Sequence, residues 1–230
     1  NELRKQVKNT DEDAVIIGEV WEDASNKHSY GALRPYLTGG QLDGVMNYPF
    51  RAAIIDYVKG CLNAKEFNRR IMSIFENYPL PALLSSMTFL SSHDTTRILT
   101  ALSDAPCVIE LSRNEQAKFV LTEEQYDIAN RRLKLALLLQ FTLPGVPSIY
   151  YGDEAGMQGY SDPFCRGCYP WGAEDKELIS YYKEFCSLRK SSVAFQKGIT
   201  MMVYGEGSTC AFIRRYEKEM YLIVLNTDNK

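Results

Sequence analysis

Short apolar runs that end in polar or charged residues recur along the first two thirds of the chain. They are rich in Val, Ile and aromatic residues and too short for helices, which is typical of strands. The first run is apolar enough for a strand buried on both faces. The runs cover residues 14–21 (AVIIGEVW), 41–50 (QLDGVMNYPF), 85–94 (SSMTFLSSHD) and 145–154 (GVPSIYYGDE). This pattern predicts four strands.

Longer segments with helical patterns lie between and after these runs. Residues 50–62 and 64–77 follow the second run, and residues 175–190 form a further amphipathic pattern. Residues 123–145 begin behind Thr122, an expected N-cap, with two Glu in the first turn, and end at Pro-Gly. Strands that alternate with helices predict a parallel sheet in an α/β fold.

The pattern changes after Ser192. Residues 198–226 alternate between apolar and polar positions and contain turn signals at 205–207 and 217–219, as in an antiparallel meander. We therefore expect two domains. Residues 1–192 form the α/β domain, and residues 193–230 form the first strands of an all-β domain.

Polar residues cluster where the predicted strands end. Because ligands bind at the carboxyl ends of the strands in parallel α/β sheets and barrels, these residues are expected to lie near one another. A carboxylate at the end of a buried strand is also costly unless something uses it. The residues are Glu19, Asn47, His93, Asp94, Asp153 and Glu154, of which Asp153 and Glu154 are assigned to architecture rather than chemistry.

Composition narrows the class of function. A net charge of -3 without a basic run argues against nucleic acid or an anionic membrane surface as partner. No apolar run reaches the ~18 residues that a membrane span needs. The Cys165/Cys168 pair is a lone C-x-x-C in a chain with two His, so no metal or cofactor is predicted. Free thiols in a reducing cytoplasm are the preferred interpretation of the cysteines.

Glu19 and the His93-Asp94 pair form a set suited to glycosidic bond cleavage. One acid can protonate the leaving oxygen while the other groups stabilise a cationic sugar transition state. Either acid alone has an equally good structural explanation, because strand-end carboxylates often cap the next helix. The two together, in aromatic surroundings, favour catalysis.

Three segments resemble the α-amylase family of glycoside hydrolases, in the order and spacing of that family. They are GEVW at 18–21, FLSSHDTTR at 89–97 and GVPSIYYGDEAGM at 145–157. Two more segments are similar to the narrower branch of neopullulanases, cyclomaltodextrinases and maltogenic amylases. These are LDGVMNYPFR at 42–51 and DPFCRGCYPWG at 162–172. The resemblance covers nearly the whole chain. It implies the C-terminal half, strands five to eight, of a (β/α)8 TIM barrel, followed by the start of the antiparallel C-terminal domain.

The resemblance also implies roles for single residues. Glu19 is the general acid/base, and Asp94 holds sugar hydroxyls and stabilises the transition state. The implied substrate-binding residues are His93, Trp21, Asn47, Tyr48, Asp162 and Arg166. Trp21 and Tyr48 resemble walls on the leaving-group side, where a ring can stack on a sugar face. Asp162 and Arg166 resemble a loop on the non-reducing side, for which a loop-pinning ion pair is the alternative.

One catalytic group of the family is expected outside this chain. Retaining glycosidases need a carboxylate nucleophile about 5–5.5 Å from the acid. In the family this is an Asp in a motif before the GEVW segment, hence upstream of Asn1; Asp11 and Asp13 precede the strand at its wrong end. We therefore expect a fragment, inactive alone, of a hydrolase acting on the α-1,4 or α-1,6 bonds of cyclodextrins, maltooligosaccharides or pullulan.

Two other functions stay open. The same scaffold can transfer a sugar to another sugar hydroxyl instead of water, and a barrel that lost turnover can act as a glucan-binding or assembly module. Half a barrel also exposes strand edges that invite association. A homodimer, or association with the missing half-barrel, is the expected partnership alongside α-glucan oligosaccharides.

Overall fold

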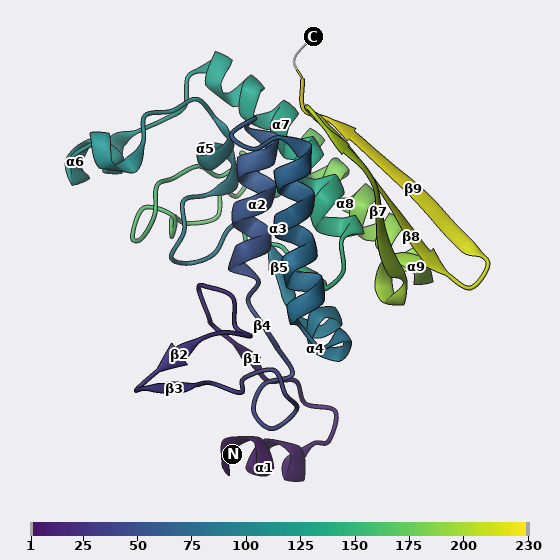
Figure 1. The fold of residues 1–230 in the computed structure, drawn as a ribbon. Helices are drawn as coiled ribbons and strands as arrows, with labels where there is room; N and C mark the ends of the chain where they lie inside the picture. The colour runs from purple at the N-terminus through teal and green to yellow at the C-terminus, as the bar shows by residue number, and fades with distance from the viewer. Residues whose placement is uncertain (1, 229–230) are drawn as a thin grey trace.

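The computed structural model describes residues 2–228, as nine helices and nine strands (Figure 1). The helices are α1 (Glu2–Thr10), α2 (Tyr48–Val58), α3 (Ala64–Asn77), α4 (Leu80–Ser85), α5 (Ile98–Leu102), α6 (Arg113–Lys118), α7 (Glu123–Thr142), α8 (Lys176–Ser191) and α9 (Val193–Lys197), with a 3-10 turn at Val108–Glu110. The strands are β1 (Ile17–Gly18), β2 (His28–Ser29), β3 (Ala32–Leu33), β4 (Gly44–Val45), β5 (Met87–Phe89), β6 (Val146–Ser148), β7 (Ile199–Glu206), β8 (Thr209–Tyr216) and β9 (Glu219–Asn226).

Each of the four predicted strands is present, and they pair in parallel. β1 pairs with β4, and β5 pairs with β6. A single parallel bridge between Met46 and Met87 links the two pairs, so the spatial order is β1, β4, β5, β6. Gly44 makes this approach possible, because a Cβ there would lie 2.6 Å from the Ser85 carbonyl oxygen. The α/β prediction is confirmed.

The first strand differs from its prediction. Only Ile17 and Gly18 are paired, and Val15 and Ile17 are 63% and 38% exposed, so the run 14–21 is not buried on both faces. The physical reason is that β1 has β4 on one side and, among residues 2–228, no strand on the other. An apolar run predicts burial only where a neighbouring element covers it.

Helix boundaries follow local capping signals closely. α3 spans the predicted 64–77, with the Asn63 side chain accepting from the Glu66 N–H. α7 begins after the predicted N-cap Thr122, which forms a capping box with Gln125. α2 begins at Tyr48 rather than residue 50, because Asn47 is its N-cap and accepts from the Phe50 N–H. The β2–β3 hairpin and the short helices α4, α5, α6 and α9 have no counterpart in the predicted elements.

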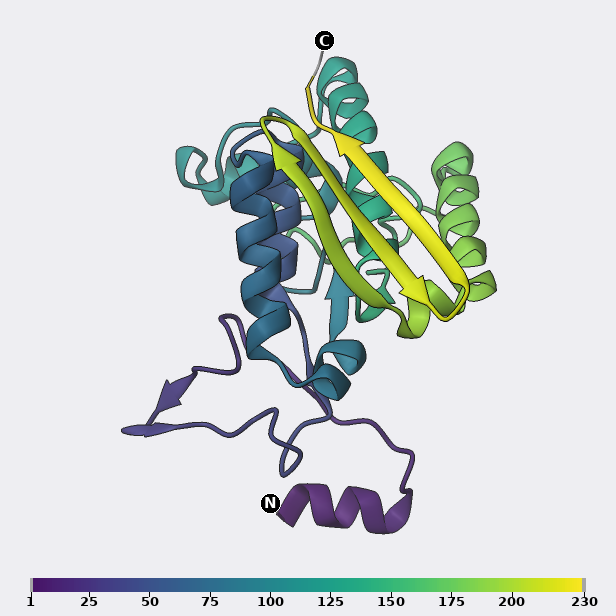
Figure 2. The same ribbon diagram turned by 45° about the vertical axis from the view of Figure 1, so that its right-hand side comes forward.

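The predicted meander is confirmed as an antiparallel sheet in the order β7, β8, β9 (Figure 2). One face packs against α3 and α9 and shares the hydrophobic core through Cys210, Phe212, Ile223 and Leu225. The other face exposes Met220, Leu222 and Val224. The strict alternation of buried and exposed positions along β9 is what the sequence pattern predicts for a sheet with one covered face.

Two buried arginines, one on α8 and one on this sheet, bond the carbonyls at the carboxyl end of α7. The last carbonyls of a helix lack partners within the helix and carry partial negative charge, so cationic donors suit them. Arg189 on α8 donates to the carbonyls of Phe141, Leu143 and Gly145. Arg214 on β8 donates to those of Thr142, Ala194, Phe195 and Gly198. Burial lowers the pKa of Arg189 to about 10 and that of Arg214 to about 9.

No helix within residues 2–228 has the length and apolar character that crossing a membrane requires.

We predict that Arg214→Met lowers the free energy of unfolding by about 3 kcal/mol or more, because it leaves buried carbonyl groups without their donor. Urea denaturation would measure the loss. The neighbouring Arg215→Met is the matched control, since Arg215 is exposed and bonds only the Glu217 carbonyl. Its expected effect is within about 0.5 kcal/mol. Equal losses in the two variants would contradict the capping role of Arg214.

Candidate active site

Glu19 follows β1 directly and is held by a tyrosine from α2. The Tyr48 hydroxyl donates to Glu19 Oε1 at 2.8 Å. Tyr48 is placed by Asn47, whose side chain caps α2 and whose Nδ2 is buried with no protein partner among the described residues. Burial, with the nearby Glu19 carboxylate, raises the pKa of Tyr48 to about 12. Tyr48 therefore stays a hydrogen-bond donor to Glu19 at neutral pH.

Aromatic rings form one continuous stack beside Glu19. The Trp21 and Tyr48 rings are parallel with centroids 4.2 Å apart, and Phe89 meets Tyr48 edge-on at 4.8 Å. Tyr48 is 5% exposed, whereas Trp21 is 53% exposed. That both rings line a sugar site stays a prediction, for which Trp21 offers an exposed ring face and Tyr48 does not. Its ring is covered by Trp21 and Phe89, and it offers its hydroxyl instead.

His93 and Asp94 follow β5 and lie against Glu19. The ligand atoms of Glu19, His93 and Asp94 all lie within 4.8 Å of one another, although β1 and β5 are far apart in the sequence. His93 Nε2 is 3.4 Å from Asp94 Oδ2. The Ser92 hydroxyl accepts from the Asp94 N–H. Two carboxylates and an imidazole thus converge at the carboxyl ends of the strands, as the strand pattern predicted.

Arg166 joins a later loop to this group. Its guanidinium is 3.0 Å from Asp94 Oδ1 and 2.8 Å from Asp162 Oδ1, and its Nε also donates to the His93 carbonyl. The Cys165 thiol donates to the same carbonyl at 3.0 Å. Asp162 and Arg166 therefore form an ion pair that fixes their loop and also reaches the candidate site. The two interpretations given to this pair from the sequence are compatible in the structure.

Asn47 is placed differently from the other predicted sugar contacts. It is fully buried and caps α2, so its side chain has no surface on which a sugar could rest in this structure. Asn47 as a direct sugar contact stays a prediction; in this structure its side chain caps α2, the helix that begins with Tyr48. Trp21, His93, Asp162 and Arg166 are all exposed around Glu19 and Asp94.

Arg97 is the residue that sequence reasoning missed. Its side chain is completely buried and donates to the carbonyls of Tyr151 and Cys165 and to Asp153 Oδ1, at 2.6, 2.9 and 3.1 Å. Burial raises the pKa of Asp153 to about 6, against the effect of Arg97. Arg97 ends the segment FLSSHDTTR, so its place in a segment that already resembled the α-amylase family was the available signal. This buried pair agrees with the architectural assignment of Asp153.

Metal binding has one geometric candidate. Within the part of the chain that the structure describes, Glu19, His93 and Asp94 are the group of possible ligands close enough to share an ion. Exposed acidic groups are common without an ion, and Asp94 already has Arg166 as its cationic partner. The C-x-x-C cysteines contribute to no such group among residues 2–228.

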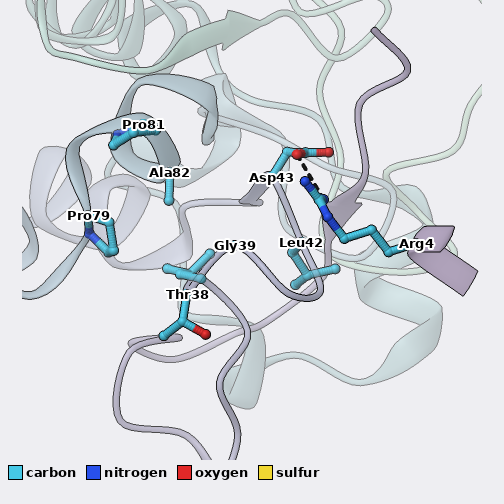
Figure 3. A pocket seen from close by; sticks show the side chains of 9 residues that line it. Arg4, Thr38, Gly39, Leu42, Asp43, Pro79, Pro81 and Ala82 are labelled. Carbon is cyan, nitrogen blue, oxygen red and sulfur yellow. Dashed lines mark hydrogen bonds and ion pairs between the residues drawn. The ribbon is translucent and has the colours of Figure 1, made fainter. Parts of the chain in front are cut away.

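A cavity of about 470 Å³ lies at the other end of the strands (Figure 3). Asp43, just before β4, lines this cavity and forms an ion pair with Arg4, with 2.9 Å between Asp43 Oδ1 and Arg4 Nη1. Burial acts to raise the pKa of Asp43, but the Ile16 N–H, Arg4 and Lys8 together outweigh burial, so the pKa is lowered. The rest of the lining is Leu37, Thr38, Gly39, Leu42, Pro79, Pro81 and Ala82. Among the residues that line this cavity, Arg4 and Asp43 are the titratable side chains.

The fold and the convergent acids agree with the comparisons with known proteins. Residues 1–190 match the catalytic domain of α-amylases. Because this match covers most of the chain, the protein belongs to the α-amylase family of glycoside hydrolases.

Relatives place the chain within this family more narrowly. It is 35% identical to the cyclomaltodextrinase of Thermoanaerobacter pseudethanolicus, over 99% of this chain and 34% of the relative. It is 34% identical to neopullulanase 2 of Thermoactinomyces vulgaris, over 98% of this chain and 34% of the relative. The solved cyclic α-maltosyl-(1→6)-maltose hydrolase of Arthrobacter globiformis superposes with a TM-score of 0.80 at 26% identity, covering 98% of this chain and 44% of that one. The predicted resemblance is confirmed, and the chain spans about a third of the length of both curated relatives.

Proposed function

We propose that the chain supplies the acid/base half of a retaining α-glucan hydrolase that cleaves α-1,4 or α-1,6 bonds of cyclodextrins, maltooligosaccharides or pullulan. The observation that carries the proposal is the convergence of Glu19 with His93 and Asp94, from separate strands, at the carboxyl end of a parallel sheet. The names of the relatives support the substrate class.

The geometry supports a separate catalytic or binding role for each of these groups. Glu19 donates a proton to the leaving glycosidic oxygen and later takes one from water. The Tyr48 hydroxyl holds the carboxylate in place. Asp94, fixed by Arg166 and next to His93, accepts hydrogen bonds from sugar hydroxyls and opposes the positive charge that develops on the sugar. Trp21 offers an exposed ring on the leaving-group side.

The nucleophile is proposed to come from a barrel half that precedes these strands. The relatives are about three times as long as this chain, and the parallel order β1, β4, β5, β6 supports the proposal that these are strands five to eight of a barrel. β7 to β9 would then begin the C-terminal domain, with the boundary near Ser192. The free cysteines support the reducing, cytoplasmic location predicted from the sequence.

Transglycosylation uses the same residues and differs only in the acceptor, so product analysis of the complete protein distinguishes it from hydrolysis. A glucan-binding or assembly module is the alternative from another class. Sequencing the gene upstream of Asn1 distinguishes this module from the enzyme, because only the enzyme needs an Asp nucleophile there.

We predict that Glu19→Gln in the complete protein lowers kcat about 1000-fold and leaves the melting temperature unchanged. The amide keeps the shape of the carboxyl group, but its N–H protons are far too weakly acidic to be transferred to the leaving oxygen. Asp94→Asn should lower kcat similarly, because a neutral amide opposes developing positive charge poorly. Steady-state kinetics and calorimetry measure both effects. A Glu19→Gln rate within tenfold of wild type removes Glu19 from the acid role.

We also predict that the 230-residue chain alone shows no hydrolysis of β-cyclodextrin or maltotriose. Residues that act as a unit in catalysis leave little rate when one is absent. The test is informative because Glu19 and Asp94 are close enough for Asp94 itself to be considered as nucleophile. Activity of the purified chain that Glu19→Gln abolishes would give Asp94 that role and refute the missing nucleophile.

The exposed strand edges lead to a prediction about association. Apolar side chains in or next to the two outer strands are exposed: Val15 and Ile17 at β1 are 63% and 38% exposed, and Val146 and Ile149 at β6 are 53% and 36% exposed. Covering such apolar side chains contributes roughly 1.5–3 kcal/mol each. We expect light scattering to give twice the mass of one chain at micromolar concentration, and addition of the preceding half-barrel to compete with this dimer. A monomer that binds no hydrophobic dye would contradict the exposed half-barrel.

A further inference from the structure

Two aromatic rings stand together beyond Arg166. Trp171 is 83% exposed, the more exposed of the two tryptophans in the chain. The Tyr169 ring lies beside it, with centroids 4.6 Å apart and planes inclined by 50°. Large exposed apolar surfaces on soluble proteins often mark binding sites, and tryptophan in particular combines an apolar face with a hydrogen-bonding edge.

The loop holds these rings in a defined place. The Trp171 N–H donates to the Tyr169 carbonyl at 2.9 Å, and the Ala173 N–H donates to the Pro170 carbonyl at 2.9 Å. Gly172 has a φ of +82°, which lets the chain turn away, and a Cβ built there would meet nothing within 4 Å. Burial, with the nearby Glu154 and Glu174 carboxylates, raises the pKa of Tyr169. The backbone of the loop therefore holds the two rings in a defined place, with the Trp171 ring exposed to solvent.

This loop also continues directly from the candidate active site. Arg166 contacts Asp94 at 3.0 Å, and the Tyr151 hydroxyl donates to the Gly167 carbonyl at 2.7 Å. Five residues of extended chain span at most about 18 Å, which limits the distance between Arg166 and Trp171. A ligand held at Asp94 needs to extend by only a few sugar units to reach Trp171.

We propose that Trp171, together with Tyr169, forms an outer sugar-binding platform that holds an α-1,4-linked glucan chain several units away from Glu19 and Asp94. One face of a glucose ring is lined by C–H groups and matches an exposed indole, while its hydroxyl edge stays in water. Two inclined rings fit a curved α-1,4 chain better than one flat surface. The direction in which the glucan runs rests on the proposed function, whereas sugar binding at Trp171 does not.

The test is calorimetric titration of the complete protein in a Glu19→Gln background, which separates binding from turnover. Maltoheptaose is the long ligand and maltotriose the short one. We expect Trp171→Ala to lower the ratio of maltoheptaose to maltotriose affinity about tenfold, and Trp171→Tyr to restore most of it, because a ring is retained. Leu80→Ala is the matched control, since Leu80 is 56% exposed and lies before β5, at the opposite end of the strands.

The outcomes separate this inference from the proposed function. An unchanged affinity ratio in Trp171→Ala, or equal weakening of both sugars, would overturn the outer platform. Failure of the Tyr replacement to restore the ratio would also overturn it, because the effect would then not come from an aromatic face. Loss of the ratio in Trp171→Ala while the Glu19-containing protein hydrolyses no glucan would support the platform and reject the hydrolase.

Discussion

The buried guanidinium of Arg97 is the contact on which the candidate site depends. It joins the segment after β5 to two later segments, through the Tyr151 and Cys165 carbonyls and the Asp153 carboxylate. The rings of Tyr150 and Tyr151 cover it at 4.6 and 4.8 Å. Separating these segments would leave a buried charge without its ion-pair and hydrogen-bond partners, which costs several kcal/mol, about 3–5 when a buried pair is broken.

The two carboxylates of the site are held in place by two different sets of contacts. Arg97 sets the loop in which Cys165 and Arg166 both bond the His93 carbonyl, and so fixes Asp94. Glu19 is placed separately, by Tyr48 at the start of α2. The parts meet through the Tyr48–Phe89 ring contact and the Met46–Met87 bridge. Catalytic geometry of this kind needs support from packed side chains, and here both supports are buried.

The features that the sequence predicted are those with local signals. Asn63 and Thr122 define helix starts by hydrogen bonds within a few residues, and the strand ends place Glu19 and Asp94 on one edge. Strand length was not predictable, because it depends on which neighbours exist. Arg97 was missed because arginine is usually exposed, and its burial depends on carbonyls from residues more than fifty positions away. The capping role of Asn47 was not predicted, because capping and sugar binding can use the same amide.

Glu19 and the apolar side chains at the edge of the sheet are exposed for the same reason, because no strand covers the outer side of β1 among residues 2–228. General acid catalysis on a glycoside needs a site from which water is largely excluded, so that the fixed charges act at short range in a low dielectric. In this chain Glu19 and His93 are exposed, and so are Val15 and Ile17 on the strand that carries Glu19. An additional strand beside β1 would cover the apolar side chains and form a wall next to the acid at the same time. The hydrophobic effect that closes the sheet is thus also what would make the carboxylates effective.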